Sequence, residues 1–221
     1  VDGQIRYRAV NSCIQFLPTI DGKHLLTAED LAKGKDLHPA QATLVKSDGS
    51  QCGFCTPGFV MSMFTLLTDS EAPDISDIED ALAGNLCRCT GYGPIISATM
   101  EASRGMAAYV PPASIQPKAE DLQNLSDGRQ LCVETPGRRF RSPRSLAQLI
   151  SCLEDNPKAT LVAGTTDVGL WVTKRHLQLT DLIYLGEVAE LKSIGDEGDW
   201  LSIGAAVTYT DAQQFLGRHY R

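Results

Sequence analysis

The chain has 221 residues, of which 43% are hydrophobic, and its formal net charge is −7 at pH 7. This length allows one large hydrophobic core or two modest ones. The acidic balance excludes the basic surface that nucleic acids and anionic membranes attract, so we expect neither as a partner. The longest apolar run, residues 57–67, is far too short to span a membrane.

The cysteine count indicates a reducing compartment. Seven is an odd number, which argues against a closed set of disulfides, and four of the cysteines form two tight pairs. Thiolates bound to metal in a reducing cytosol fit this pattern better, so we expect a cytoplasmic protein. No signal peptide is apparent after Val1, and because the first residue is not methionine we expect a piece of a longer chain.

Residues 1–35 are expected to form the end of a β-rich unit. Residues 5–10 alternate in polarity as a strand does, and residues 16–26 have the pattern of a second strand, interrupted at Pro18 and at Asp21-Gly22. This segment is too short to bury a core by itself.

Residues 36–109 have the pattern of a domain of four short helices. Pro57 suits the first turn of one helix, and Asp74 or Ser76 would cap the next, whose apolar positions are Ile75, Ile78, Ala81, Leu82 and Leu86. The expected helices cover residues 38–46, 57–66, 75–86 and 95–108.

Residues 110–137 are expected to be a linker, because they are rich in Pro, Gln, Asp and Ser and show no sustained period. An α+β domain should then begin and occupy residues 138–221. Its expected elements are a helix over residues 145–155 and strands over residues 159–163, 182–185 and 201–203.

Two cysteine pairs are the most informative feature: Cys52 and Cys55 in SQCGFCTPG, then Cys87 and Cys89 in GNLCRCTGY. Two antiparallel helices between the pairs would bring them together. Four convergent thiolates bind zinc or an iron–sulfur cluster. Zinc sites usually present two CxxC halves, so the CxC half favours the cluster. A thioredoxin-like dithiol is a weaker alternative, because no βαβ unit precedes Cys52 and the second pair would have no role.

Three glycines, Gly53, Gly58 and Gly91, lie beside these cysteines. Glycine has no Cβ, so the backbone at these positions could approach the sulfur atoms closely. The alternative is that they form ordinary turns and helix ends. A cluster here would transfer single electrons only, so substrate chemistry would need another site.

The two cysteine-bearing strings, residues 49–67 and 84–95, resemble the helical [2Fe–2S] domain of the molybdenum hydroxylases, the xanthine dehydrogenase and aldehyde oxidase family. The resemblance implies that Cys52, Cys55, Cys87 and Cys89 ligate one [2Fe–2S] cluster. It also implies that Gln51, together with Cys89, approaches the molybdopterin of the catalytic part.

Cys13 stands alone in the string VNSCI, and by its surroundings would be a buried residue in a strand. The family resemblance implies instead a metal ligand, the fourth cysteine of a second cluster in a plant-type ferredoxin domain of β-grasp fold. The C-x4-C-x2-C loop that would supply its other ligands is not in this sequence. We therefore expect a chain truncated at its N-terminus, with Cys13 prone to oxidation.

Residues 160–167 follow an expected strand and are rich in small residues, a pattern that is more often an ordinary turn. Backbone N–H groups and hydroxyls there could hold a diphosphate, although the GxGxxG fingerprint is absent. The segment resembles the first flavin-binding loop of the family's FAD domain, and residues 201–211 resemble the next strand and turn. The implied FAD contacts are Thr160, Leu161, Val162, Ala163, Gly164, Thr165, Thr166 and Asp167. A second phosphate-binding loop would lie beyond Arg221, so we expect truncation at this end too.

Taken over the whole chain, the resemblance implies a multidomain α+β fold: a remnant of a ferredoxin domain, a four-helix [2Fe–2S] domain and the N-terminal part of an FAD-binding domain. It resembles an electron-transfer subunit of a xanthine dehydrogenase-like oxidoreductase. Such a subunit passes electrons from molybdenum on a molybdopterin-binding large subunit, through [2Fe–2S] clusters, to FAD and NAD during hydroxylation of hypoxanthine or xanthine. The implied assembly is a heterotetramer with two copies of each chain. A zinc-stabilised interaction module and an inactive truncated chain remain as alternatives.

Overall fold

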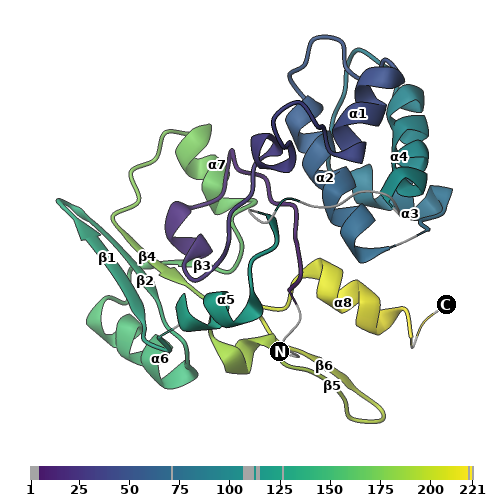
Figure 1. Cartoon of the computed structure of the whole chain (residues 1–221). Coiled ribbons are helices and arrows are strands. Elements are labelled where there is room, and N and C mark those ends of the chain that lie inside the picture. The colour runs from purple at the N-terminus through teal and green to yellow at the C-terminus, as the bar shows by residue number, and fades with distance from the viewer. Residues whose placement is uncertain are drawn as a thin grey trace. The chain divides into compact units, whose positions relative to one another are not determined.

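The computed structural model describes residues 5–70, 72–106, 112, 115–125, 127–218 and 220. The chain forms two compact units. The helical unit comprises Val1–Asn11 and His24–Gln123, and the sheet unit comprises Ser12–Lys23 and Asn124–Arg221. Helices and sheets are both present, which confirms the predicted α+β class (Figure 1).

The helical unit contains the four predicted helices. These are α1 (Pro39–Lys46), α2 (Thr56–Asp69), α3 (Ile75–Leu82) and α4 (Gly93–Met106). The last was predicted to reach residue 108, but residues 107–111 lie outside the described part of the chain, as does the predicted domain end at residue 109.

Local chemistry explains where these helices begin. His38 Nδ1 accepts a hydrogen bond of 3.0 Å from the Ala40 N–H group, and Pro39 occupies the first turn of α1. Pro57 lies in the first turn of α2, where its missing N–H group costs nothing. Asp74, rather than Ser76, caps α3 by accepting a bond of 2.9 Å from the Asp77 N–H group.

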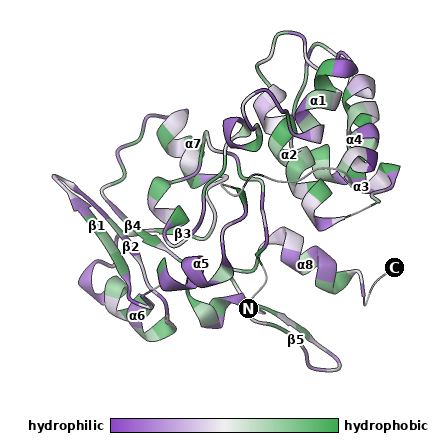
Figure 2. Ribbon diagram, viewed as in Figure 1, coloured by the Kyte–Doolittle hydropathy of each residue, from purple (hydrophilic) through white to green (hydrophobic). Residues whose placement is uncertain are grey.

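The core of the helical unit lies between its helices. Hydrophobic residues, green in Figure 2, occur along α2. Ile78 and Leu82 on α3 are buried, as their spacing predicts, but Ile75 is 54% exposed and Leu86 is 83% exposed. The predicted burial of Leu86 assumed that the helix continues to this residue. Because α3 ends at Leu82, Leu86 does not lie on the buried face of the helix. The most completely buried core side chains are Leu31, Leu44, Phe59, Met63, Ile78 and Ile95.

The two strands predicted near the N-terminus are wrong. Residues 5–16 have no regular structure, and residues 17–20 form a 3-10 helix, η1 (Leu17–Ile20), with Pro18 in its first turn. Alternating polarity makes a strand only when a partner strand is available, and between residues 5 and 36 the described backbone pairs at a single bridge, Lys33 with Asp36. A second 3-10 helix, η2 (Ala28–Leu31), precedes α1.

A four-stranded sheet of order β1-β2-β4-β3 organises the sheet unit. β1 (Leu131–Thr135) and β2 (Arg138–Ser142) form an antiparallel hairpin, and β4 (Asp181–Tyr184) lies parallel to both β2 and β3 (Thr160–Val162). Two antiparallel strands, β5 (Ile194–Asp196) and β6 (Leu201–Ile203), form a separate ribbon. The helix α8 (Tyr209–Leu216) follows.

The expectation of an irregular linker over residues 110–137 is wrong in two places. Residues 119–125 form the helix α5 (Ala119–Leu125), and residues 131–135 form β1. Neither buries an apolar stripe: α5 has no buried residue and four of the five residues of β1 are exposed. Sequence periodicity depends on burial, so it missed α5, which buries none of its residues, and β1, which is held by its hairpin pairing with β2.

Helices cover both faces of the main sheet. Ile183 packs with Leu149 and Cys152 of α6 (Leu146–Asp155), while Leu182 packs with Phe140 and Val162 on the other face. Val168, at the start of α7 (Val168–Thr173), joins this second cluster. Successive strand residues point to opposite faces, so β4 contributes to both cores.

A buried ion-pair network ties β2 to β4 and α6. Asp181 accepts bonds of 2.8 Å from Arg139, Arg141 and Asn156, all at Oδ2. Asp155 pairs with the same two arginines at 2.7 Å and 3.0 Å, but its side chain is 54% exposed, against 8% for Asp181. Burial alone would raise the pKa of Asp181, but the hydrogen bonds from Arg139 and Asn156 and the charge of Arg141 outweigh it and lower the pKa.

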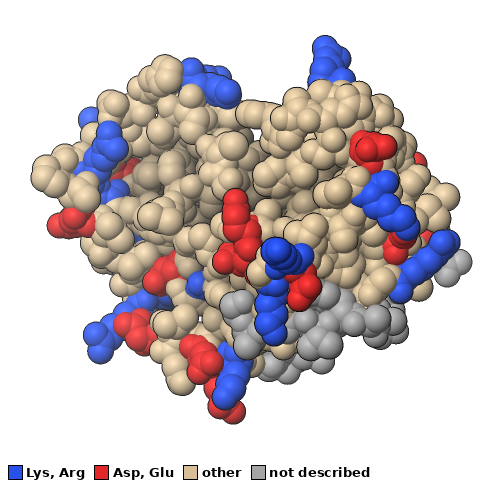
Figure 3. Space-filling view, turned by 45° about the horizontal axis from the view of Figure 1, so that its top comes forward, with Lys and Arg blue, Asp and Glu red and all other residues tan. Residues whose placement is uncertain are grey.

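Charges elsewhere are dispersed. On the face drawn in Figure 3, acidic and basic side chains alternate in small groups. None of the helices in the described residues has the length and hydropathy needed to cross a bilayer.

We predict that Asp181→Asn destabilises the sheet unit by up to about 3–5 kcal/mol, because the buried Arg141 would keep only the solvated Asp155 as its counter-charge. Asp155→Asn, the matched control, should cost less than about 1 kcal/mol, because Asp155 is solvated. Urea unfolding at pH 7 measures both. Equal losses in the two variants would contradict this account.

Stability should also depend on pH. Since the pKa of Asp181 is lowered in the folded state, the contribution of this carboxylate to the free energy of unfolding is complete above the ordinary pKa of aspartate and is lost as the pH falls below that value.

Candidate functional site

The start of α2 and the loop after α3 bring the two cysteine pairs together. Cys55 is the N-cap residue of α2, and Cys52 lies three residues before it. Cys87 and Cys89 lie in the loop between α3 and α4. The Cys52 thiol lies close enough to the Cys89 thiol for each to shift the pKa of the other, and the same holds for Cys55 and Cys87.

Asn85 fastens this loop to α2. Its Nδ2 donates to Ser62 Oγ at 2.7 Å, and its backbone N–H group donates to the Leu82 carbonyl at 2.9 Å. A Cβ atom at Gly58 would lie 2.8 Å from Asn85 Oδ1, closer than real Cβ contacts allow. Gly58 therefore admits the Asn85 side chain rather than a sulfur atom, and the approach of the loop to α2 depends on both residues.

The other two glycines near the cysteines serve turns. Gly53 has φ +82° and Gly91 has φ +68°, a region that favours glycine, and a Cβ atom at either would meet no neighbour within 4 Å. Their conformation lets the chain reverse beside Cys52 and Cys89. The turn interpretation therefore holds at these two positions.

The four thiols differ in acidity. Hydrogen bonds from the Thr90 hydroxyl and backbone N–H group lower the pKa of Cys87 to about 7. A bond from the Phe54 N–H group, with the contact to Cys89, lowers the pKa of Cys52. Burial, with the contact to Cys87, raises the pKa of Cys55. The contact with Cys52 raises the pKa of Cys89.

Two large apolar residues next to the cysteines in sequence are exposed together with them. Cys52, Cys89 and Gln51 are exposed, Phe54 is 95% exposed and Leu86 is 83% exposed. Among the described residues no set of three or more His, Cys, Asp or Glu side chains is already arranged around a metal position.

Cys13 lies in a turn of the sheet unit and is exposed, so the expectation of a buried strand residue is wrong. Of the other cysteines, Cys152 is buried in the core of the sheet unit, as its place on an amphipathic helix predicts. Cys132 is exposed on β1.

The predicted flavin loop, residues 160–167, runs from β3 to the start of α7. Val162 is fully buried in the core, and Thr165 is only 6% exposed because its hydroxyl donates to Gln15 Oε1 at 3.2 Å. Gly169, just beyond the loop, packs so closely against the Ile14 carbonyl that no Cβ atom would fit. The loop is therefore anchored to Ser12–Lys23. Its exposed members are Leu161, Ala163, Gly164, Thr166 and Asp167.

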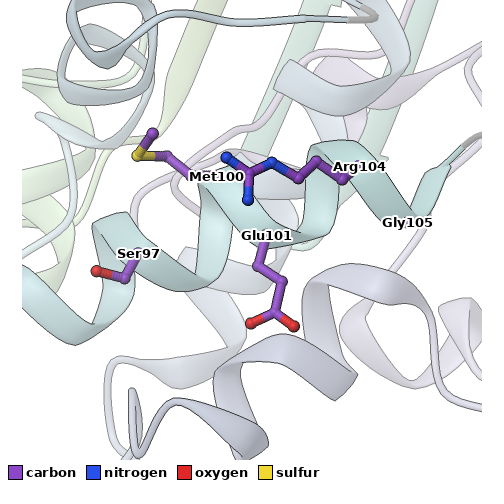
Figure 4. Close-up of a pocket in the computed structure, with 5 residues that line it drawn as sticks. All are labelled: Ser97, Met100, Glu101, Arg104 and Gly105. Atoms are coloured by element: carbon purple, nitrogen blue, oxygen red, sulfur yellow. The ribbon is translucent and has the colours of Figure 1, made fainter.

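Sequence patterns missed the residues that hold these sites: Asn85, Thr90 and Tyr92 around the cysteines, and Gln15 at the flavin loop. Each acts through a polar contact to its own or a distant segment, which hydrophobic periodicity does not report. A shallow hollow along α4, lined by Ser97, Met100 and Arg104 among others (Figure 4), contains none of the predicted site residues.

Comparison with known proteins matches both halves of the chain. A family described as "[2Fe-2S] binding domain" matches residues 27–100, which include both cysteine pairs. A family described as "FAD binding domain in molybdopterin dehydrogenase" matches residues 136–221, which include the flavin loop.

Curated relatives extend this match over most of the chain. Xanthine dehydrogenase of Drosophila subobscura is 33% identical over 96% of this chain and 19% of its own length. Xanthine dehydrogenase 2 of Arabidopsis thaliana is 38% identical over 86% of this chain and 14% of its own length. The chain thus spans less than a fifth of these relatives.

Among solved structures, quinoline 2-oxidoreductase from Pseudomonas putida 86 is 36% identical over 37% of this chain and 51% of its own, with a TM-score of 0.35. The two domain matches follow each other in the order in which the cysteine site and the flavin loop occur here. The chain is an iron–sulfur/FAD region of the xanthine dehydrogenase type, with a [2Fe–2S] binding domain followed by an FAD-binding domain.

Proposed function

We propose that this chain is the electron-transfer subunit of a xanthine dehydrogenase-like oxidoreductase. The observation that carries the proposal is that both cysteine pairs lie within the part of the chain that matches a [2Fe–2S] binding domain, with each thiol of one pair near a thiol of the other. The ligands proposed for one cluster are Cys52, Cys55, Cys87 and Cys89.

The donor set fits such a cluster. A [2Fe–2S] cluster takes four thiolates, two on each iron, and when bound it accepts and releases one electron at a time. Cys52, Cys89, Cys55 and Cys87 would supply the four thiolates that hold the cluster. Gly53 and Gly91 form the turns beside Cys52 and Cys89.

In the sheet unit we propose that the exposed part of the flavin loop contacts the diphosphate of FAD. Gly164 and Thr166 lie on the surface between β3 and α7, where backbone N–H groups and a hydroxyl are available to phosphate oxygens. Thr165 has a different role, since its bond to Gln15 fixes the shape of the loop. The proposed final acceptor is NAD.

A molybdopterin-binding large subunit is the proposed partner, in a heterotetramer located in the cytoplasm. The relatives' name, xanthine dehydrogenase, supports hypoxanthine or xanthine as the hydroxylated substrate. Exposed Phe54 and Leu86 beside the thiols are the kind of side chains that become buried in a protein interface, and Gln51 lies among them. Cys13 is the proposed ligand of a second cluster whose other ligands lie outside this sequence.

We predict that the anaerobically prepared chain binds about two irons and gives the low-temperature EPR signal of a reduced [2Fe–2S] cluster. Cys52→Ser and Cys87→Ser should lose both, because each removes one of the four thiolates. Cys132→Ser is the matched control, an exposed cysteine on β1 whose loss should leave iron and signal unchanged.

Stoichiometric zinc in place of iron, in protein made under iron-replete and oxygen-free conditions, would contradict the electron-transfer function. It would favour the zinc-stabilised interaction module instead. Iron that survives both substitutions would place the cluster on other residues.

Thiol reactivity in the metal-free chain gives a second prediction. Because thiolate is the reactive form and the pKa of Cys87 is about 7, its alkylation by iodoacetamide should reach half its maximal rate near pH 7. Cys55, whose pKa is raised, should need a pH above that of an ordinary thiol. Peptide mapping by mass spectrometry across pH 5–10 separates the two sites. Faster reaction of Cys55 than of Cys87 at pH 7 would show that the Thr90 contacts are absent in solution.

A further inference from the structure

One of the four thiols lies in a small polar network. Thr90 Oγ1 is 3.2 Å from Cys87 Sγ, and the Thr90 backbone nitrogen is 3.5 Å from the same sulfur. The Thr90 hydroxyl also accepts a hydrogen bond of 3.2 Å from the Tyr92 N–H group. A thiolate has no hydrogen to give, so in the thiolate form of Cys87 the hydroxyl must donate to the sulfur.

Tyr92 fixes the other side of Cys87. The Cys87 N–H group donates to Tyr92 Oη at 3.1 Å, so the loop closes on itself through both residues. The Tyr92 ring packs edge-on against Phe59, at 6.4 Å between centroids, and Phe59 is buried in α2. Tyr92 has φ +68°, which is uncommon for a residue other than glycine and indicates that the surrounding contacts hold it in place.

We propose that Thr90 is a positioning residue that raises the reduction potential of the cluster, by donating its hydroxyl hydrogen to Cys87 Sγ. This inference rests on the proposed function and adds to it a residue that is not a ligand. Tyr92 maintains the bond, because it holds both the Thr90 hydroxyl and the peptide of Cys87.

The physical reason is the electron density on sulfur. A hydrogen bond to a ligating thiolate withdraws density from it and makes it a weaker donor to iron, which favours the form that carries one more electron. Hydrogen bonds to charged groups are stronger than neutral ones, and one of ordinary strength changes an equilibrium about tenfold. The Thr90 hydroxyl should therefore shift the one-electron reduction equilibrium by about tenfold, or about 59 mV.

The test is an EPR-monitored redox titration of the iron-loaded chain. Thr90→Val keeps the shape of the side chain but removes the hydroxyl, and should lower the midpoint potential by that amount. Thr90→Ser keeps the hydroxyl and should restore the wild-type potential. Thr68→Val is the matched control: Thr68 bonds to the Thr65 carbonyl near the far end of α2, so this variant should leave the potential unchanged.

Unchanged potential in Thr90→Val, or an equal fall in Thr90→Ser, would overturn the inference. If Thr90→Val takes up no iron, Thr90→Ala replaces it with the same expectation. If neither takes up iron while Thr90→Ser does, the hydroxyl acts in assembly rather than on the potential, and the inference is wrong. A wild-type chain that holds no iron would remove the proposed function itself, a failure seen before any variant is made.

Discussion

The close packing of Gly58 against Asn85 is the contact on which the cysteine arrangement depends. α2 presents one cysteine pair at its start, and the loop after α3 presents the other, but nothing in either element alone brings them together. The missing side chain at position 58 lets Asn85 reach Ser62, and the loop that follows is then fixed two residues before Cys87. A larger residue at position 58 would displace the Asn85 side chain from its bond to Ser62.

The helical unit combines a tightly packed core with a cysteine site that is exposed at the surface. Phe59, Met63 and Ile95 fill the interior of the helical unit, while Cys52 and Cys89 lie at the surface with Phe54 and Leu86. A relay of electrons needs ligands that hardly move when charge changes, and it also needs access for a partner. The helical core can supply the first property, and under the proposed function the exposed loop residues would supply the second.

The sequence predicted α2 and α3 well because each has its own start signal: Pro57 and Asp74 lie where the structure uses them. The N-terminal strands failed because a strand exists only with a partner, and α5 and β1 were missed because neither buries an apolar face. The cofactor-binding domain types are confirmed by the family matches. The roles of individual cysteines and loop residues stay predictions, and their supporting contacts depend on long-range packing that no local pattern encodes.

The anchoring of the flavin loop by Ser12–Lys23 has a consequence for how such proteins can be divided or recombined. Ile14 and Gln15 precede helices α1 to α4 in sequence, yet they complete the packing around Thr165 and Gly169. The helical unit and the sheet unit therefore cannot be separated at a single point in the sequence. If the flavin-binding half were exchanged between relatives, residues 12–23 would have to be exchanged with it. Otherwise the loop would lose its contacts with Ile14 and Gln15.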